Sequence, residues 1–73
     1  MKHTTKIEIF GRTYMIQGDA NADYALRLAE YVDKKMREVS EKTPTVSSLK
    51  VAILAALNIA DELFKLRETT KIS

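Results

Sequence analysis

The side chains that could act chemically on a substrate are few and scattered. His3 is the single histidine and precedes the first predicted strand. Because a catalytic histidine needs an orienting partner and a pocket, we expect His3 to be a solvated terminal residue. Asp61 and Glu62 are adjacent carboxylates, but successive helical positions point about 100° apart and cannot share a substrate atom. We expect Asp61 to pair with Lys65, four residues on, and Glu62 to face solvent.

Composition argues against an enzyme, a metalloprotein or a membrane protein. The 73 residues include no cysteine and two glycines, which excludes thiolate metal sites and glycine-rich phosphate loops. Twelve Lys and Arg against ten Asp and Glu leave a net charge of +2, which gives nucleic-acid binding only a little support. No signal peptide or membrane-spanning run is evident. We therefore expect a cytoplasmic protein with no cofactor, no nucleic-acid partner and no membrane association.

Two polar side chains remain as candidates for recognition. Arg12 is predicted at the tip of a hairpin, where a guanidinium can form forked hydrogen bonds to a carboxylate of an acidic partner. The alternative is that Arg12 is only solvated. Asn58 borders the apolar arc of a helix, where a buried amide can fix the register of an interface. A solvent-facing Asn58 beside Asp61 explains the sequence equally well.

Arg12 is positioned by a hairpin predicted at about 5–17. A two-residue turn at Gly11 and Arg12, of type II′ with Gly first, sets Ile9 opposite Tyr14 and Ile7 opposite Ile16. The apolar side chains of both strands then share one face. An isolated hairpin is barely stable in water, so this one must pack on helices.

Two helices follow, at about 21–41 and about 48–68. Asp19 or Asn21 is predicted to cap the first, and Pro44 to separate the two. Ser47 is predicted to cap the second, where Val46 would pack on Val51 as a hydrophobic staple. Residues 69–73 are expected to fray. Tyr24 and Tyr31 are placed at the edge of the apolar stripe of the first helix, with wet hydroxyls.

The second helix carries more apolar surface than a chain of this size can cover. We expect one flank to close a small core and the other to form a homodimer interface through seven residues: Leu49, Ile53, Ala56, Ile59, Ala60, Leu63 and Leu66. Val51 and Leu54 stand apart in a polar sector, either covered by a second surface or simply exposed. The predicted fold class is α+β, a single domain over residues 1–73 with both helices on one face of the hairpin.

Three segments resemble the ZapA family of bacterial cell-division proteins. These are IFGRTY at Ile9–Tyr14, VDKKMREV at Val32–Val39 and AALNIADEL at Ala55–Leu63, and they occur in the order and spacing of the family. The resemblance covers about residues 6–67. It implies a head domain of a hairpin and helices, whose second helix continues as a coiled coil. Because the chain stops at Ser73, we expect most of that coiled coil to be missing.

The resemblance also implies a function. Family members are non-enzymatic regulators that bind FtsZ, the tubulin-like GTPase of the mid-cell division ring, and promote lateral association and stabilisation of its filaments. They form homodimers that can pair into homotetramers. The arginine of the family's GR turn corresponds to Arg12, and Lys42 and Lys50 are neighbouring candidates for the same contact. The rival hypothesis is a dimeric DNA-binding module of the ribbon-helix-helix kind, which uses one strand per subunit instead of a hairpin.

Overall fold

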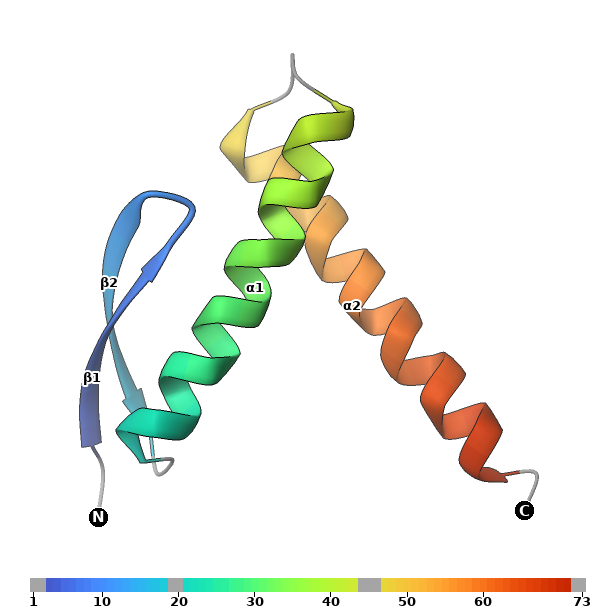
Figure 1. Ribbon diagram of the computed structural model, residues 1–73, viewed down its shortest axis with the longest axis horizontal. Coiled ribbons are helices and arrows are strands. Elements are labelled where there is room, and N and C mark those ends of the chain that lie inside the picture. Colours follow the sequence, from blue (N-terminus) through green and yellow to red (C-terminus); the bar gives the residue numbers. More distant parts are fainter. Residues whose placement is uncertain (1–2, 19–20, 44–46, 72–73) are drawn as a thin grey trace.

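The computed structural model describes residues 3–18, 21–43 and 47–71. The elements follow in the order β1 (His3–Ile9), β2 (Arg12–Gly18), α1 (Ala22–Lys42) and α2 (Ser48–Lys71). The two helices form a V, and the hairpin lies along the α1 arm (Figure 1). The molecule is flat, with extents of 40 × 36 × 14 Å. The predicted hairpin followed by two helices is confirmed.

The hairpin has a different turn from the predicted one. Ile9 pairs with Arg12 and Ile7 with Tyr14, so the two turn residues are Phe10 and Gly11. Their φ angles are 53° and 77°, as a type I′ turn requires, and the expected type II′ turn at Gly11 and Arg12 is wrong. The register differs by two residues, which leaves every side chain on the face predicted for it because strand side chains alternate with period two. His3 belongs to β1 and not to a segment ahead of it.

Both helices begin at the predicted caps. The amide of Tyr24 donates to Asn21 Oδ1 at 2.9 Å, and the amide of Lys50 donates to Ser47 Oγ at 3.2 Å. Asp19, Pro44 and Val46 lie outside the described residues. The second helix is longer than expected, since it continues through the segment predicted to fray as far as Lys71. Within that segment the Thr69 hydroxyl donates to the carbonyl of Lys65 at 3.0 Å.

The core lies where α1 crosses α2. Met36 and Val39 of α1 pack against Val51 and Ala55 of α2, which are 2% and 1% exposed. Ile9 and Phe10 at the turn of the hairpin, with Val32, Ala52 and Leu54, surround this cluster. Val51 and Leu54 therefore belong to the core and its border, which resolves the alternatives left open for them. Val51 lies in a polar sector of the α2 sequence because α1 covers that part of the helix.

The two helices differ in how much of the hairpin they contact. α1 packs along β1, whereas α2 packs on α1 and reaches the hairpin only at its turn end. Among the described residues, no Cα of β2 lies within 8 Å of a helix Cα. The inner face of β2 is thus left largely open. None of the helices in the described part is long and apolar enough to cross a membrane.

Candidate functional site

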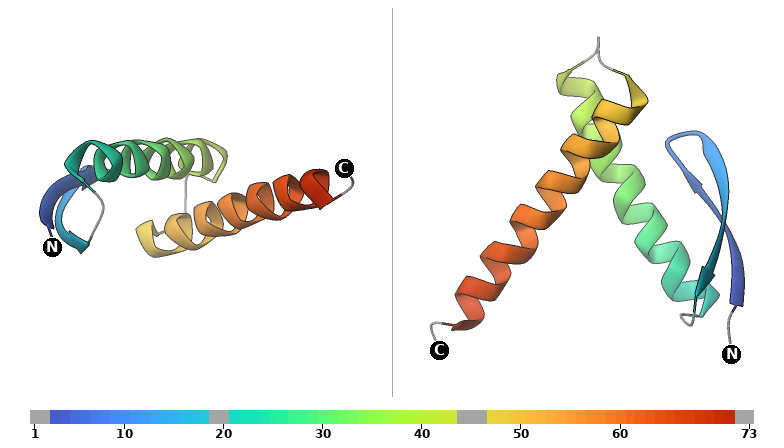
Figure 2. Two further views of the ribbon diagram at one scale, coloured as in Figure 1. Left: turned by 90° about the horizontal axis from the view of Figure 1, so that it is seen from below. Right: turned by 180° about the vertical axis from the view of Figure 1, so that it is seen from behind.

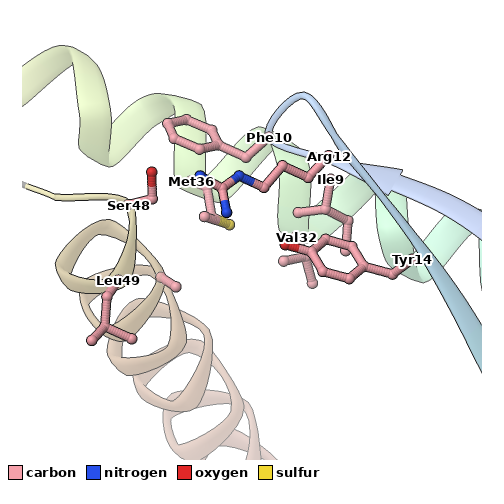
Figure 3. Close-up of a pocket in the computed structure, with 9 residues that line it drawn as sticks. Ile9, Phe10, Arg12, Tyr14, Val32, Met36, Ser48 and Leu49 are labelled. Atoms are coloured by element: carbon pink, nitrogen blue, oxygen red, sulfur yellow. The ribbon is translucent and has the colours of Figure 1, made fainter.

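Arg12 stands at the first position of β2 and not in the turn. It shares the inner face of the hairpin with Ile9 and Tyr14, and its side chain is exposed. Figure 3 shows the guanidinium reaching from the hairpin toward the first turn of α2. It lies along a cavity of about 420 Å³ that it lines together with residues from the hairpin, α1 and α2, namely Ile9, Phe10, Tyr14, Val32, Met36, Ser48, Leu49 and Ala52. The predicted projection of Arg12 from the tip is wrong, because the shifted turn places it one step inside the strand.

The turn beside Arg12 is tied to α1 by a carboxylate. The amide of Phe10 donates to Asp33 Oδ1 at 2.7 Å, and Arg37 Nε donates to Asp33 Oδ2 at 2.9 Å. The Arg37 guanidinium carbon lies 6.0 Å from the centroid of the Phe10 ring. We call Phe10, Asp33 and Arg37 the turn anchor. It fixes the left-handed backbone of Phe10, a conformation that costs a non-glycine residue about 1–2 kcal/mol, and so fixes where β2 begins.

Electrostatics keep the turn anchor charged. The hydrogen bond from Arg37, and after it the one from the Phe10 amide, hold the pKa of Asp33 below its usual value. The hydrogen bond to Asp33 in turn raises the pKa of Arg37. Asp33 and Arg37 belong to one of the segments that carry the family resemblance, but no pattern along the chain indicates that they contact residue 10. Sequence reasoning missed them for that reason.

Lys42 and Lys50 flank the connection between the helices. Lys42 ends α1 and Lys50 lies in the first turn of α2, and both are exposed. The cavity that Arg12 lines includes Ser48 and Leu49, so Arg12 approaches the same end of α2. In the part of the chain that the structure describes, no carboxylate oxygen lies within 4.0 Å of these three cations. The three candidate residues therefore present positive charge near the vertex of the V.

Glu62 is not solvated as predicted but bridges the two helices. It accepts hydrogen bonds from the Tyr31 hydroxyl and from Lys35 Nζ, and Lys35 also lies 5.3 Å from the Tyr31 ring centroid. The bonds from Lys35 and then Tyr31 lower the pKa of Glu62, and the bond to Glu62 raises the pKa of both Lys35 and Tyr31. The Tyr31 hydroxyl is thus engaged by protein. The predicted pair of Asp61 and Lys65 is confirmed, at 2.9 Å.

Three carboxylates of the helices are paired with cations. Asp33, Asp61 and Glu62 each neutralise a neighbouring cation. Within the described ranges, no group of three His, Cys, Asp or Glu side chains is placed to hold a metal ion. What the described residues expose beside these pairs is the positive charge of Arg12, Lys42 and Lys50 and the apolar side chains of α2.

The residues predicted for the dimer interface lie mostly on the open side of α2. Leu49, Ile53, Leu63 and Leu66 are 71%, 52%, 45% and 64% exposed. Ala56 and Ala60 are exposed too, whereas Ile59 is half-buried. Leu57 and Phe64, which the prediction omitted, are 61% and 60% exposed. Asn58 is exposed in the single chain.

Comparison with known proteins connects this arrangement to one family. The family model of the cell division protein ZapA matches residues 5–73. A curated cell division protein ZapA from a Geobacillus species is 40% identical over 67 residues, which are 92% of this chain and 77% of the relative. One from Bacillus pumilus is 39% identical over 67 residues, covering 92% of this chain and 79% of the relative.

A solved structure agrees with the sequence comparisons. It is described as a ZapA mutant dimer from Geobacillus stearothermophilus, is 37% identical, and superimposes with a TM-score of 0.77. The match covers 97% of this chain and 83% of that one. The fold and the sequence therefore agree, and the chain belongs to the ZapA family of cell division proteins.

Proposed function

We propose that this protein binds FtsZ and promotes lateral association and stabilisation of its filaments at the division ring. The observation that carries the proposal is the exposed side chain of Arg12 at the start of β2, directly after the anchored turn, in a chain of the ZapA family. An exposed arginine side chain can donate two parallel hydrogen bonds to a carboxylate. Lys42 and Lys50 add positive charge to the same surface.

Dimerisation explains how a contact between Arg12 and FtsZ would bring filaments together. Each copy offers one Arg12 surface, so a dimer offers two and holds neighbouring filaments by avidity even when the single contact is weak. A longer coiled coil would extend the assembly to a homotetramer with four such surfaces. The activity is non-enzymatic, and we expect a fluorescent fusion to collect in the cytoplasm at the mid-cell ring.

Co-sedimentation of purified FtsZ with and without the protein tests the proposal. We expect more FtsZ in the pellet and greater light scattering, with a clear reduction for Arg12→Glu. Arg27→Glu is the matched control, because it makes the same change of charge at an arginine that stacks on Tyr24, 5.6 Å from the ring centroid, near the start of α1. Unchanged pelleting by the dimeric wild-type protein would refute the proposed function. Equal activity of the two variants would remove Arg12 from the contact.

The DNA-binding alternative has no observation in its favour. A ribbon-helix-helix protein builds its ribbon from one strand of each subunit, whereas β1 and β2 here pair within one chain. The same preparation tests this alternative by titration with duplex DNA over a range of salt concentrations. Tight binding that weakens steeply with salt would support it, because phosphate contacts release counterions.

A further inference from the structure

The sequence of the hairpin fits two registers, and the structure contains one of them. In the observed register Ile9 pairs with Arg12, and the turn consists of Phe10 and Gly11. A shift of two residues would pair Phe10 with Thr13 and move the turn to Gly11 and Arg12. Both registers keep the same side chains on the inner face, because strand side chains alternate with period two. The alternation of apolar residues therefore does not select between them.

Turn chemistry favours the register that the structure does not adopt. A type I′ turn requires a positive φ at both of its central residues, and Phe10 accordingly has a φ of 53°. This conformation is unfavourable for phenylalanine, whereas asparagine, aspartate and glycine adopt it more readily. In the shifted register Gly11 would occupy the first position of a type II′ turn, which is the one position of that turn that needs a positive φ. A contact outside the turn is therefore needed to offset the strain at Phe10.

The contact outside the turn is the hydrogen bond from the Phe10 amide to Asp33. The nitrogen lies 2.7 Å from Asp33 Oδ1, in a partly buried position. In the shifted register Phe10 would be the strand residue directly before the turn, and its amide would donate to the carbonyl of Thr13 across the ladder. The amide has one hydrogen, so Asp33 and Thr13 compete for it. Each acceptor stabilises one register.

We propose that Asp33 selects the register of the hairpin and is thereby the positioning residue for Arg12 in the contact with FtsZ. In the observed register Arg12 begins β2 and lines the cavity beside Ser48 and Leu49 of α2. In the shifted register it would be the second turn residue, at the tip of the hairpin. The hairpin runs alongside α1 with its turn toward the vertex of the V (Figure 2). The register therefore decides whether the guanidinium lies at the cavity or beyond the end of the strands.

An ionised aspartate suits this role. The hydrogen bond from Arg37, and after it the one from the Phe10 amide, lower the pKa of Asp33, so its side chain is a carboxylate at neutral pH. A carboxylate accepts a stronger hydrogen bond than a neutral carbonyl such as that of Thr13. The packing of the Phe10 ring on the core favours the same register. Removal of Asp33 alone is therefore expected to populate the second register without eliminating the first.

Cross-strand contacts in NMR spectra distinguish the two registers. Opposite residues that are not hydrogen-bonded to each other bring their Hα atoms close together, and these pairs differ between the registers. The observed register predicts a contact between Glu8 and Thr13, whereas the shifted one predicts a contact between Ile9 and Tyr14. We expect the wild-type protein to show the first contact alone and Asp33→Ala to show both, since the lost bond shifts the equilibrium by about tenfold or more. Each interchange opens the ladder, so the hairpin amides also exchange with water faster.

Two further variants identify the property of Asp33 that matters. Asp33→Asn retains a side-chain oxygen that can accept from the Phe10 amide, so we expect the first contact to dominate again. Asp61→Ala is the matched control, because Asp61 also pairs with a cation four residues on, Lys65, but does so within α2. The first contact alone in Asp33→Ala would overturn the proposal, as would a spectrum of Asp33→Asn that matches it. Loss of both contacts would overturn it too, because Asp33 would then keep the hairpin folded and not choose its register.

Co-sedimentation of FtsZ with the same four proteins tests the positioning role, which rests on the proposed function, whereas the selection of register does not. Each single contact should weaken in proportion to the fraction of chains that keep the observed register, about twofold when half of them have shifted. Asp33→Asn and Asp61→Ala should remain close to the wild-type protein. Full activity of Asp33→Ala in a mixed register would remove the positioning role. If the wild-type protein leaves FtsZ in the supernatant, the proposed function fails while the NMR result on the register stands.

Discussion

Replacing Gly11 by alanine isolates the energetic requirement of the hairpin turn. Gly11 has φ +77°, and a Cβ added to it meets no heavy atom within 4 Å, so the only obstacle to alanine is the backbone conformation. A left-handed conformation costs an L-residue about 1–2 kcal/mol. Alanine also restricts the unfolded chain, which stabilises the fold by about 0.4–1 kcal/mol. We therefore expect Gly11→Ala to lower the free energy of unfolding by about 1 kcal/mol or slightly less.

Gly18→Ala provides a control in which the second contribution acts alone. Gly18 also has open space around its Cβ position, but its φ lies outside the left-handed range. Because the effect on the unfolded chain is common to both variants, it cancels in their difference, which leaves the cost of the turn at about 1–2 kcal/mol. For a domain of this size that corresponds to about 4 to 16 °C between their melting temperatures.

Thermal and urea unfolding followed by far-ultraviolet circular dichroism measure this difference. Both variants are compared at one protein concentration, since the stability of a dimer depends on concentration. Equal midpoints for Gly11→Ala and Gly18→Ala would refute the reasoning. That result would mean that the turn at Phe10 and Gly11 does not limit the stability of the fold.

Three further perturbations test the core, the turn anchor and the bridge between the helices. Val51→Ala should lower the free energy of unfolding by about 1.5–3 kcal/mol at every protein concentration in urea titrations, whereas the effect of Leu57→Ala should shrink as the protein is diluted. Asp33→Ala, which removes the acceptor, should speed hydrogen exchange of the Phe10 amide in NMR spectra while leaving the core amides protected, and unchanged exchange would contradict the anchor. Because the pKa of Glu62 is lowered in the folded chain, its contribution is present above its unfolded value near 4.5 and is lost as pH falls through the lower folded value. Glu62→Gln should accordingly flatten the acid side of a plot of stability against pH.

The alternation of apolar residues predicted which side chains share a face of the hairpin but not their pairing. A shift of two residues exchanges every cross-strand partner and moves no side chain to the other face, so alternation alone accepts either register. Turn chemistry favoured Gly11 as the first turn residue, because glycine is the usual choice for a positive φ. The structure instead places Phe10 there and stabilises it through Asp33, which lies 23 residues further along the chain. Turn preferences depend only on neighbouring residues, so they cannot predict a hydrogen bond between the Phe10 amide and Asp33.

In the helices too, features set by neighbouring residues were predicted, whereas features set by packing between helices were not. Their starts follow from Asn21 and Ser47, whose side chains act within three residues of themselves, and both caps are confirmed. The prediction for Glu62 was wrong, and the environment of Val51 was left open, because the surroundings of both residues depend on how α1 crosses α2. A carboxylate on a polar helical stripe faces water unless another element brings a cation and a hydroxyl to it, as α1 does here with Lys35 and Tyr31. Arg12 was identified as the candidate residue, but its place in the strand followed from the register that local rules did not resolve.

The turn anchor has a consequence for how this surface can vary. Asp33 binds the main-chain amide of residue 10, an atom group that every amino acid except proline provides. This hydrogen bond therefore does not depend on which side chain residue 10 carries, provided that the residue tolerates a positive φ, whereas the packing of the Phe10 ring on the core does depend on it. A contact made through the main chain is retained when the side chain at this position changes, so part of the attachment can persist while the surface beside Arg12 varies. Substitution of residue 10 by asparagine or glycine would retain the hydrogen bond to Asp33 while losing the packing of the ring, whereas proline would abolish the hydrogen bond as well.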